Sequence, residues 1–383
     1  MTKTRSLDTK CLHLEEDEGE CRHYGAVSFP IYQTATYTHL GLGNSTGFDY
    51  SRLQNPTREH LEKIVAQLEN GIDAFALSSG MAAISLVMEL FLPGDELLVD
   101  SDLYGGSIRL FDNVLNKNGV VVRSVECYNC EIEQYITKNT KAVYVETPTN
   151  PMMNVIDLAR LSEIAKKHQL LLIVDNTFLS PYFQNPLSLG ADIVVHSGTK
   201  FLGGHNDTLA GFIISNHPTV CERLRFLIKT VGSGLAPFDC WLIERGIKTL
   251  AVRMEKAQQN AMRIAEWLQT RNEVKRVIYP GLKSHPGYEI MKSQAHGFGS
   301  MITFEMHSKD DAVKILENVR LVKFAESLGG VETLITYPIT QTHADVPDDV
   351  RKKNGITECI LRLSVGIEDT TDLLSELEHV IEL

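Results

Sequence analysis

Short apolar runs and amphipathic stretches alternate along the first two thirds of this chain. Residues 58–69 carry Leu61, Ile64, Val65 and Leu68 at the spacing of one helix face. Runs of strand length and strand composition stand at 75–77, 97–99, 120–122, 142–145, 170–174 and 193–195. Helix-length segments such as 158–168 separate several of these runs, so the pattern predicts a parallel sheet with helical crossovers and an α/β fold.

The pattern changes on either side of this region. A long helical stretch at 246–270 leads to strand-like runs at 301–305 and 360–364, which is typical of an α+β unit. The first 55 residues are aromatic, glycine-containing and irregular, so we expect them to lie on another surface, such as a neighbouring subunit. Because 383 residues exceed what one core usually supports, we expect three parts. They are an N-terminal arm (1–55), a large α/β domain (56–245) and a smaller α+β domain (246–383).

Composition excludes several classes of function. The 43% hydrophobic and 22% charged content is that of a globular protein. A formal net charge of -12 argues against nonspecific binding to nucleic acid or to an anionic membrane, although local donors can still hold an anionic cofactor. No run approaches the roughly 18 apolar residues of a membrane span, and the N-terminus has no apolar signal region, so a cytoplasmic protein is expected.

Seven cysteines make an odd and sparse set, which favours a reducing compartment over a disulfide framework. Cys127 and Cys130 have the spacing of a redox or zinc pair. Because no second pair completes them, we expect no metal site.

The most informative chemistry is an amine and a carboxylate behind two neighbouring strand runs. Asp175 closes the run at 170–174, and Lys200 follows the run at 193–195. Parallel pairing would bring both to one carboxyl edge of the sheet, where open α/β sheets bind ligands. A lysine whose pKa of about 10.4 is lowered by burial can bond covalently to an aldehyde cofactor. Pyridoxal phosphate would use this lysine and would place its ring nitrogen beside the carboxylate. A lysine at a strand end is more often a plain surface residue, but the accompanying groups favour the cofactor.

Two further segments fit the same cofactor. Ser79 and Gly80 lie in a small-residue turn that opens a helix, and such a helix N-terminus offers free N–H groups to a phosphate. The hydroxyls of Ser197 and Thr199 would complete that phosphate site, although a serine before a helix is also an ordinary cap. Tyr104 follows the strand run at 97–99 and could cover a flat ring and move a proton. Its alternative role is to pack on its own domain.

Seven motifs in order carry a resemblance to a known family. They are Tyr50-Ser51-Arg52 with Asn55-Pro56-Thr57, Ser79-Gly80-Met81, Glu146-Thr147-Pro148-Thr149-Asn150-Pro151, Val174-Asp175-Asn176-Thr177, Ser197-Gly198-Thr199-Lys200, Glu326-Ser327-Leu328-Gly329-Gly330 and Arg362-Leu363-Ser364-Val365-Gly366. The chain resembles the Cys/Met-metabolism family of pyridoxal-phosphate enzymes. That family contains cystathionine γ-synthases, cystathionine lyases, methionine γ-lyases and O-acylhomoserine sulfhydrylases.

The resemblance implies an aspartate-aminotransferase-like fold of type I, with a large, mostly parallel sheet of about seven strands and a smaller α+β domain. It also implies a homotetramer of two tight dimers, in which Tyr50 and Arg52 reach the cofactor phosphate of the neighbouring subunit. The cofactor would be held by Tyr50, Arg52, Gly80, Met81, Tyr104, Asp175, Thr177, Ser197, Thr199 and Lys200. The catalytic groups would be Lys200, Tyr104 and Asp175. An amino-acid substrate would contact Asn150, Arg109, Glu326, Ser327, Thr342 and Arg362.

The expected reaction is replacement of the γ-substituent of an O-acylated homoserine by cysteine or sulfide. The alternative is a cystathionine lyase that releases a 2-oxo acid, ammonia and a thiol, and a non-catalytic cofactor-binding regulator is a third possibility. Gly106 stands where methionine γ-lyases usually have cysteine, which argues against that branch. Arg109 and Glu326 resemble groups that bind the distal end of cystathionine, or they are ordinary surface charges. Gly198 replaces the usual alanine and is expected to loosen the loop before Lys200. The sequence leaves the acyl group and the sulfur donor open.

Overall fold

The computed structural model describes residues 5–14, 23–128 and 131–382. Its helices are α1 (Leu7–Lys10), α2 (Pro56–Glu69), α3 (Gly80–Met88), α4 (Gly105–Leu110), α5 (Leu158–Lys167), α6 (Ser180–Phe183), α7 (Pro218–Val231), α8 (Pro237–Ile247), α9 (Leu250–Leu268), α10 (Tyr288–Gln294), α11 (Lys309–Asn318), α12 (Asp348–Lys353) and α13 (Thr370–Ile381). Its strands are β1 (Asp73–Leu77), β2 (Glu96–Asp100), β3 (Val121–Val125), β4 (Thr140–Glu146), β5 (Leu171–Asp175), β6 (Ile193–Ser197), β7 (Gly211–Ser215), β8 (Val274–Ile278), β9 (Met301–Met306), β10 (Lys323–Phe324), β11 (Leu334–Thr336) and β12 (Ile360–Ser364).

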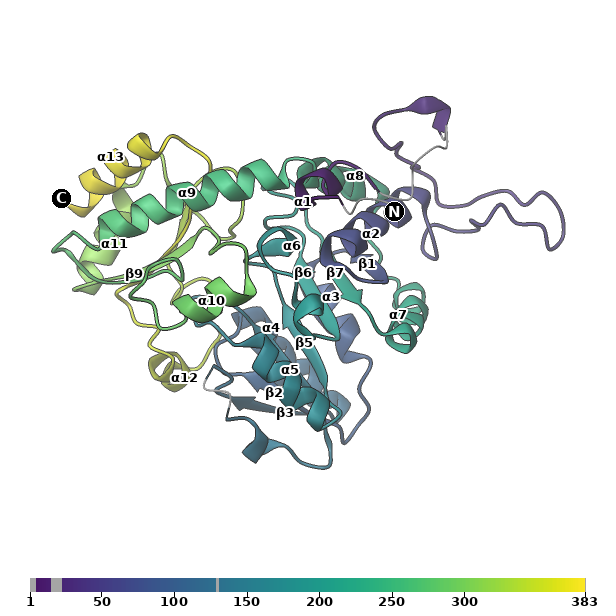
Figure 1. The fold of residues 1–383 in the computed structure, drawn as a ribbon, viewed down its shortest axis with the longest axis horizontal. Coiled ribbons are helices and arrows are strands. Elements are labelled where there is room, and N and C mark those ends of the chain that lie inside the picture. The colour runs from purple at the N-terminus through teal and green to yellow at the C-terminus, as the bar shows by residue number, and fades with distance from the viewer. Residues whose placement is uncertain (1–4, 15–22, 129–130, 383) are drawn as a thin grey trace.

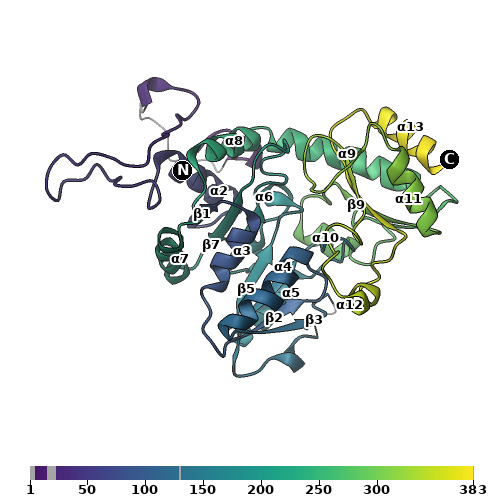
Figure 2. The same cartoon turned by 180° about the vertical axis from the view of Figure 1, so that it is seen from behind.

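The first sheet has helices on both faces (Figures 1 and 2). Its strand order in the described residues is β1-β7-β6-β5-β4-β2-β3. Strands β3, β2, β4, β5 and β6 pair in parallel, whereas β7 runs antiparallel to both β6 and β1. Alternate strand residues enter two apolar layers, one shared with α2, α5 and α8 and the other with α3 and α7. The predicted α/β fold with a mostly parallel sheet is therefore confirmed, and β7 is a strand that the pattern analysis missed.

Local sequence explains why α2 and α3 begin where they do. The Asn55 side chain caps α2 by accepting from Thr57 N, and Pro56 fills the first turn. Ser79 caps α3 by accepting from Ala82 N. The apolar face predicted for residues 58–69 is buried.

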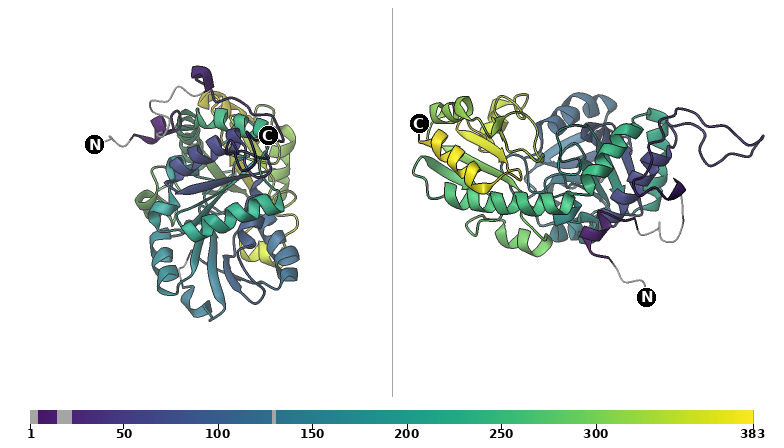
Figure 3. Two further views of the ribbon diagram at one scale, coloured as in Figure 1. Left: turned by 90° about the vertical axis from the view of Figure 1, so that its right-hand side faces the viewer. Right: turned by 90° about the horizontal axis from the view of Figure 1, so that it is seen from above.

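A second sheet, with strand order β10-β11-β12-β9-β8 in the described chain, forms a smaller unit beside the first (Figure 1). Helix α9 lies along this unit with α13 beside it (Figure 3). The prediction of one helix over 246–270 was wrong, because α8 ends at Ile247 and α9 begins at Leu250. Thr249, with φ -112° and ψ 10°, leaves the helical conformation between them. The expected domain boundary after residue 245 falls inside the last turn of α8.

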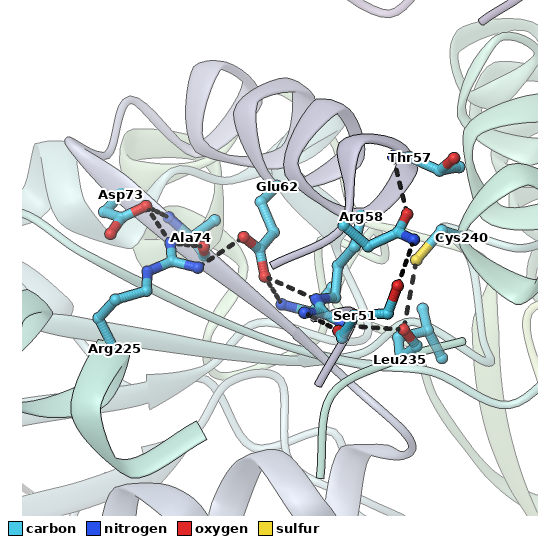
Figure 4. Close-up of polar contacts among 11 residues, drawn as sticks. Ser51, Thr57, Arg58, Glu62, Asp73, Ala74, Arg225, Leu235 and Cys240 are labelled. Atoms are coloured by element: carbon cyan, nitrogen blue, oxygen red, sulfur yellow. Dashed lines mark hydrogen bonds and ion pairs between the residues drawn. The ribbon is translucent and has the colours of Figure 1, made fainter. Parts of the chain in front are cut away.

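In the arm predicted for residues 1–55, α1 packs against α2 of the same chain, whereas much of residues 23–55 extends away from both sheets (Figures 1 and 2). At its root Arg58 donates to the carbonyls of Ser51 (2.8 Å) and Leu235 (3.3 Å), so one buried guanidinium joins the arm to the loop before α8 (Figure 4). Glu62 lies between Arg58 and Arg225 and accepts from Arg225 Nη1 at 2.7 Å. No helix in the described part of the chain is long and apolar enough to cross a membrane.

Candidate active site

Lys200 lies in the turn after β6, at the carboxyl edge of the first sheet. Its Nζ donates to Ser327 Oγ at 2.7 Å, so the second unit contacts the amine directly. Burial, with the nearby charge of Arg362, lowers the pKa of Lys200 from 10.5 to about 8, while Glu326 acts in the opposite direction. A substantial neutral fraction of this amine is therefore present near pH 8. The low pKa that covalent chemistry requires of this lysine is present in the structure.

Asp175 ends β5 and reaches the same edge, because Asp175 and Val195 are paired in the parallel ladder of β5 and β6. Its Oδ1 accepts from Thr177 Oγ1 at 2.6 Å and from Thr177 N at 3.0 Å. The hydroxyl of Thr177 also accepts from Ser197 N at 2.9 Å. Thr177 thus joins the carboxylate to the loop that leads to Lys200. The predicted parallel pairing that brings these two strand ends together is confirmed.

Gly80 forms the wall opposite Ser197. A Cβ on Gly80 would lie 2.8 Å from Ser197 Cβ, so only glycine lets the two loops approach this closely. Gly80 N and Met81 N are the first two amides of α3 and lack intrahelical acceptors, whereas Ala82 N is capped by Ser79. The two loops predicted to form one phosphate site are therefore adjacent.

Thr199 and Gly198, two further residues of the loop before Lys200, lie close to Ala210 and Phe212. The Thr199 hydroxyl is engaged by Ala210, accepting from its N at 3.0 Å and donating to its O at 3.3 Å. A Cβ on Gly198 would lie 2.5 Å from a ring carbon of Phe212. The Phe212 ring occupies the space that an alanine methyl would take, and the expectation that Gly198 loosens this loop stays a prediction.

Arg362 lies on β12 and is fully buried. Nη1 donates to Asn150 Oδ1 at 2.9 Å, and Nη2 donates to Ser327 O at 3.0 Å and Thr336 Oγ1 at 3.1 Å. Its Nε has no partner among the described residues, which is costly for a buried donor. Burial lowers the pKa of Arg362 to about 10, so the side chain is charged at neutral pH. An unpaired N–H on a buried cation is suited to receive a carboxylate.

Ser327 joins Arg362 to Lys200, because its hydroxyl accepts from the amine and its carbonyl accepts from the guanidinium. The backbone of Ser327 has φ 91°, a value that residues other than glycine rarely adopt. Backbone strain of this kind persists where the surroundings demand it and is frequent at active sites.

Tyr104 stands at the start of α4 on the same edge. Its N donates to Glu146 Oε2 at 3.0 Å, and its ring folds back over Gly106. A Cβ at Gly106 would lie 2.4 Å from the ring, so a side chain there would displace Tyr104. Tyr104 as a whole is 38% exposed, so part of the residue is accessible to a ligand.

Buried carboxylates gather behind these groups. Burial, reinforced by the charge of Asp175, raises the pKa of Glu146 well above its usual range, and burial also raises that of Asp175. The pKa of Asp102 rises to about 7 by burial. A positive ring nitrogen beside Asp175 would relieve both the desolvation and the repulsion between these acids.

Three residues expected to contact a substrate, Arg109, Glu326 and Thr342, have different surroundings. Arg109, on α4, pairs with Asp345 Oδ2 at 2.6 Å. Glu326 is exposed next to Ser327. The backbone carbonyl of Thr342 lies against Gly105, and its hydroxyl contacts His343 Nδ1 at 2.9 Å.

Tyr50 and Arg52 lie apart from this cluster. Arg52 Nη1 donates to Lys229 O at 2.5 Å, and its guanidinium stands 5.6 Å from the Tyr50 ring centre. Neither makes a hydrogen bond or ion pair with Lys200 or Asp175 within the described chain. Their expected role across a subunit boundary stays a prediction.

Four residues that contribute to the site were not expected from the sequence. Tyr144 donates to Asp175 Oδ2 at 3.4 Å, Glu146 holds the Tyr104 amide, Thr336 bonds Arg362, and Asp345 pairs with Arg109. Glu146 lies within a motif that carried the family resemblance, but only folding identifies the partners of all four. Cys130 lies outside the described residues, so the expectation for the Cys127 and Cys130 pair stays untested.

The site fits pyridoxal phosphate on the observations above. It combines an amine of lowered pKa, a carboxylate that a cation would stabilise and two adjacent loops with amide and hydroxyl donors. It also holds a buried arginine with a donor left unpaired, suited to a substrate carboxylate.

Comparisons with known proteins agree with this chemistry. A family model described as "Cys/Met metabolism PLP-dependent enzyme" matches residues 8–382. A cystathionine β-lyase of Lactococcus lactis is 46% identical over 98% of this chain and 99% of its own length. A Bacillus subtilis protein named cystathionine γ-synthase/O-acetylhomoserine (thiol)-lyase is 47% identical over 93% of this chain and 92% of its own. The crystal structure of a Lactobacillus plantarum cystathionine γ-lyase with L-serine superposes with a TM-score of 0.94, at 40% identity over 99% of each chain.

Proposed function

Because this chain belongs to the Cys/Met-metabolism family of pyridoxal-phosphate-dependent enzymes, we propose that it replaces the γ-substituent of an O-acylated homoserine with cysteine or sulfide. The products would be cystathionine or homocysteine. The observation that carries the proposal is the bridge through Ser327, which joins the Lys200 amine to the buried Arg362. It sets a base of suitable pKa beside a carboxylate anchor, as chemistry at the α-carbon of an amino acid requires.

The cofactor would be held by residues at the carboxyl edge of the first sheet. Lys200 would bond to its aldehyde and Asp175 would face its ring nitrogen. Gly80, Met81 and Ser197 would face its phosphate, and Tyr104 would cover its ring. When bound, pyridoxal phosphate supplies an electron sink for bonds at the substrate α-carbon.

The chain's own groups would then bind the substrate and move protons. Arg362 would pair with the substrate carboxylate through its free Nε, which orients the α-carbon towards Lys200. The Lys200 amine would take the α-proton and then a β-proton, because its pKa of about 8 leaves it partly neutral. Tyr104 or Lys200 would protonate the leaving group. Asp175, whose charged form the Thr177 hydrogen bonds favour, would keep the ring nitrogen positive.

Relatives support γ-replacement without deciding it. The B. subtilis relative that carries both synthase and thiol-lyase names covers almost the whole chain. The Tyr104 ring over Gly106 also leaves no room for the cysteine that methionine γ-lyases usually have there. The first point favours a homoserine ester as substrate, and the second argues against a methionine γ-lyase.

A cystathionine lyase is the second candidate, favoured by the lactococcal β-lyase and the Lactobacillus γ-lyase among the relatives. The same residues would serve it, since elimination and replacement share their first proton transfers. Supplying O-acetyl- or O-succinylhomoserine with cysteine should yield cystathionine if the first proposal holds. Rapid release of a 2-oxo acid from cystathionine, with no replacement product from either ester, would establish the lyase instead.

We also propose a homotetramer of two dimers with shared sites, because the arm projects from the chain that carries it (Figure 1). Arg52→Ala should then loosen the cofactor without altering Lys200. Light scattering measures the assembly, and dialysis followed by absorbance measures cofactor loss. A monomer that keeps its cofactor would contradict this proposal.

A further inference from the structure

A buried network lies between α2 and the strand ends that lead into the candidate site. Its centre is Glu69, the last residue of α2, which is 0% exposed. Glu69 Oε1 accepts from Asn176 Nδ2 at 2.8 Å and lies 2.6 Å from His196 Nε2. Asn176 directly follows Asp175, and His196 directly precedes Ser197. One carboxylate therefore holds the end of β5 and the end of β6 together.

An anion is unfavourable at this position unless a cation accompanies it. Glu69 stands in the last turn of α2, where the helix dipole opposes a negative charge, and burial removes the water that would solvate the carboxylate. The basic group that meets it is His196, which is 1% exposed. The short distance of 2.6 Å between the two side chains is typical of a charge-assisted hydrogen bond. An imidazolium paired with the carboxylate accounts for both the burial and the distance.

His196 lies beside Asp175 in the parallel ladder. Asp175 pairs with Val195, the residue before His196, and Asn176 N donates to Val195 O at 3.0 Å. Burial raises the pKa of Asp175, whereas the hydrogen bonds from Thr177 and then the charge of His196 lower it. The network thus brings a positive charge to the carboxylate that would face the cofactor.

Two other titratable groups face Asp175 from β4. The hydroxyl of Tyr144 donates to Asp175 Oδ2 at 3.4 Å. The charges of Glu146 and Asp175 repel each other, which adds to the effect of burial on the pKa of Glu146. Of these three neighbours of Asp175, His196 alone can carry a positive charge.

We propose that Glu69 is a positioning residue for the cofactor: it keeps His196 charged, and this charge keeps Asp175 ionised opposite the ring nitrogen. Glu69 acts only through its neighbours, because Asn176, Asn185 and His196 engage its two oxygens. The inference rests on the proposed place of Asp175 at the ring nitrogen. It applies equally to γ-replacement and to the lyase reaction, because both use the same ring.

Binding of pyridoxine 5′-phosphate to the cofactor-free protein tests the proposal without turnover. This probe has the ring nitrogen and the phosphate of the cofactor but no aldehyde, so it does not consume the Lys200 amine. Calorimetry gives its dissociation constant from pH 5 to pH 9. Affinity should fall with falling pH, because protonation of Asp175 removes the partner of the ring nitrogen. The probe titrates identically with every variant, and Glu146 is present in all of them. The shift of the midpoint between variants is therefore the quantity measured.

Glu69→Gln keeps a hydrogen-bond acceptor for both neighbours but removes the negative charge, so His196 becomes neutral. Loss of the nearby cation should raise the pKa of Asp175, and the midpoint should move up by about one pH unit. Binding should then be up to about tenfold weaker at the acid end and unchanged at pH 9. Glu69→Gln combined with His196→Gln should show the same shift, because this double variant also lacks the cation while keeping two neutral hydrogen-bonding side chains.

Glu62→Gln is the matched control. Glu62 is also a buried carboxylate of α2, but it pairs with Arg225 instead (Figure 4). Its replacement should leave the midpoint at the wild-type value.

Four results would overturn the proposal. They are wild-type binding that does not depend on pH, a midpoint that Glu69→Gln leaves in place or lowers, binding weakened equally at every pH, and a double variant with the wild-type midpoint. If Glu69→Gln alone does not fold, the double variant decides by the same criterion. A wild-type enzyme that turns over neither a homoserine ester nor cystathionine would refute the proposed function, while the shift of the midpoint would still decide the role of Glu69.

Discussion

Replacing Lys200 with methionine should stabilise the cofactor-free protein at neutral pH. The amine is held in a buried site that lowers its pKa from 10.5 to about 8. That shift of about 2.5 pKa units means that burying the charged form costs about 3 kcal/mol. Methionine has a similar length and carries no charge, so it removes this cost. Methionine also loses the hydrogen bond to Ser327, and this loss offsets about 1 kcal/mol of the gain in stability. The net gain expected at pH 7 is about 2 kcal/mol.

The gain should depend on pH in a defined direction. Below pH 8 the amine is charged in both the folded and the unfolded chain, so the folded state bears the full cost. Between pH 8 and 10.5 only the unfolded chain keeps the proton, and the cost falls towards zero. At pH 9.5 about 1.4 kcal/mol of cost remains, which the lost hydrogen bond nearly cancels.

Thermal unfolding of cofactor-free protein at pH 7 and 9.5 measures this dependence. The variant should melt about 2–4 °C above wild type at pH 7 and at nearly the same temperature at pH 9.5. Lys314→Met, at an exposed position on α11, is the control and should show no such change. A variant that is less stable at pH 7, or a difference that does not vary with pH, would refute the argument that Lys200 is strained by burial.

Three further substitutions test the site. Gly198→Ala should lower the free energy of unfolding by about 1–3 kcal/mol, because its methyl would collide with Phe212. Denaturant titration measures this loss, and a smaller loss when G198A is combined with F212L would identify that collision. Arg362→Lys keeps the charge but loses the paired N–H donors of the guanidinium, so KM for an amino-acid substrate should rise about 10–100-fold with a smaller change in kcat. An unchanged KM in steady-state kinetics would exclude Arg362 as the carboxylate anchor. Thr177→Val removes a donor that lowers the pKa of Asp175, so the acid limb of the activity profile should move to higher pH, and a limb that moves down would contradict the assignment.

Local pattern predicted much of the large sheet and its edge. The apolar spacing in α2, the strand runs and the caps are properties of neighbouring residues, so they can be recognised without the fold. The position of Lys200 beside Asp175 followed from one geometric rule, since the carboxyl ends of adjacent parallel strands share an edge. The short strand β7 was missed because its apolar run, Phe212–Ile214, is only three residues long and has no periodicity of its own.

The partners of these residues required the tertiary structure. Ser327 meets Lys200 across 127 sequence positions, and Arg109 meets Asp345 across 236. No local pattern encodes such contacts, because they depend on how the two units pack. The same packing determines the chemistry: burial lowers the pKa of Lys200, and the Phe212 ring makes Gly198 a tightly packed position. The sequence alone therefore determined which chemical groups are present and which strand ends carry them. Tertiary structure decided the distances between these groups, their pKa values and which N–H of Arg362 stays unpaired and available to a substrate. These properties depend on burial and on partners distant in sequence.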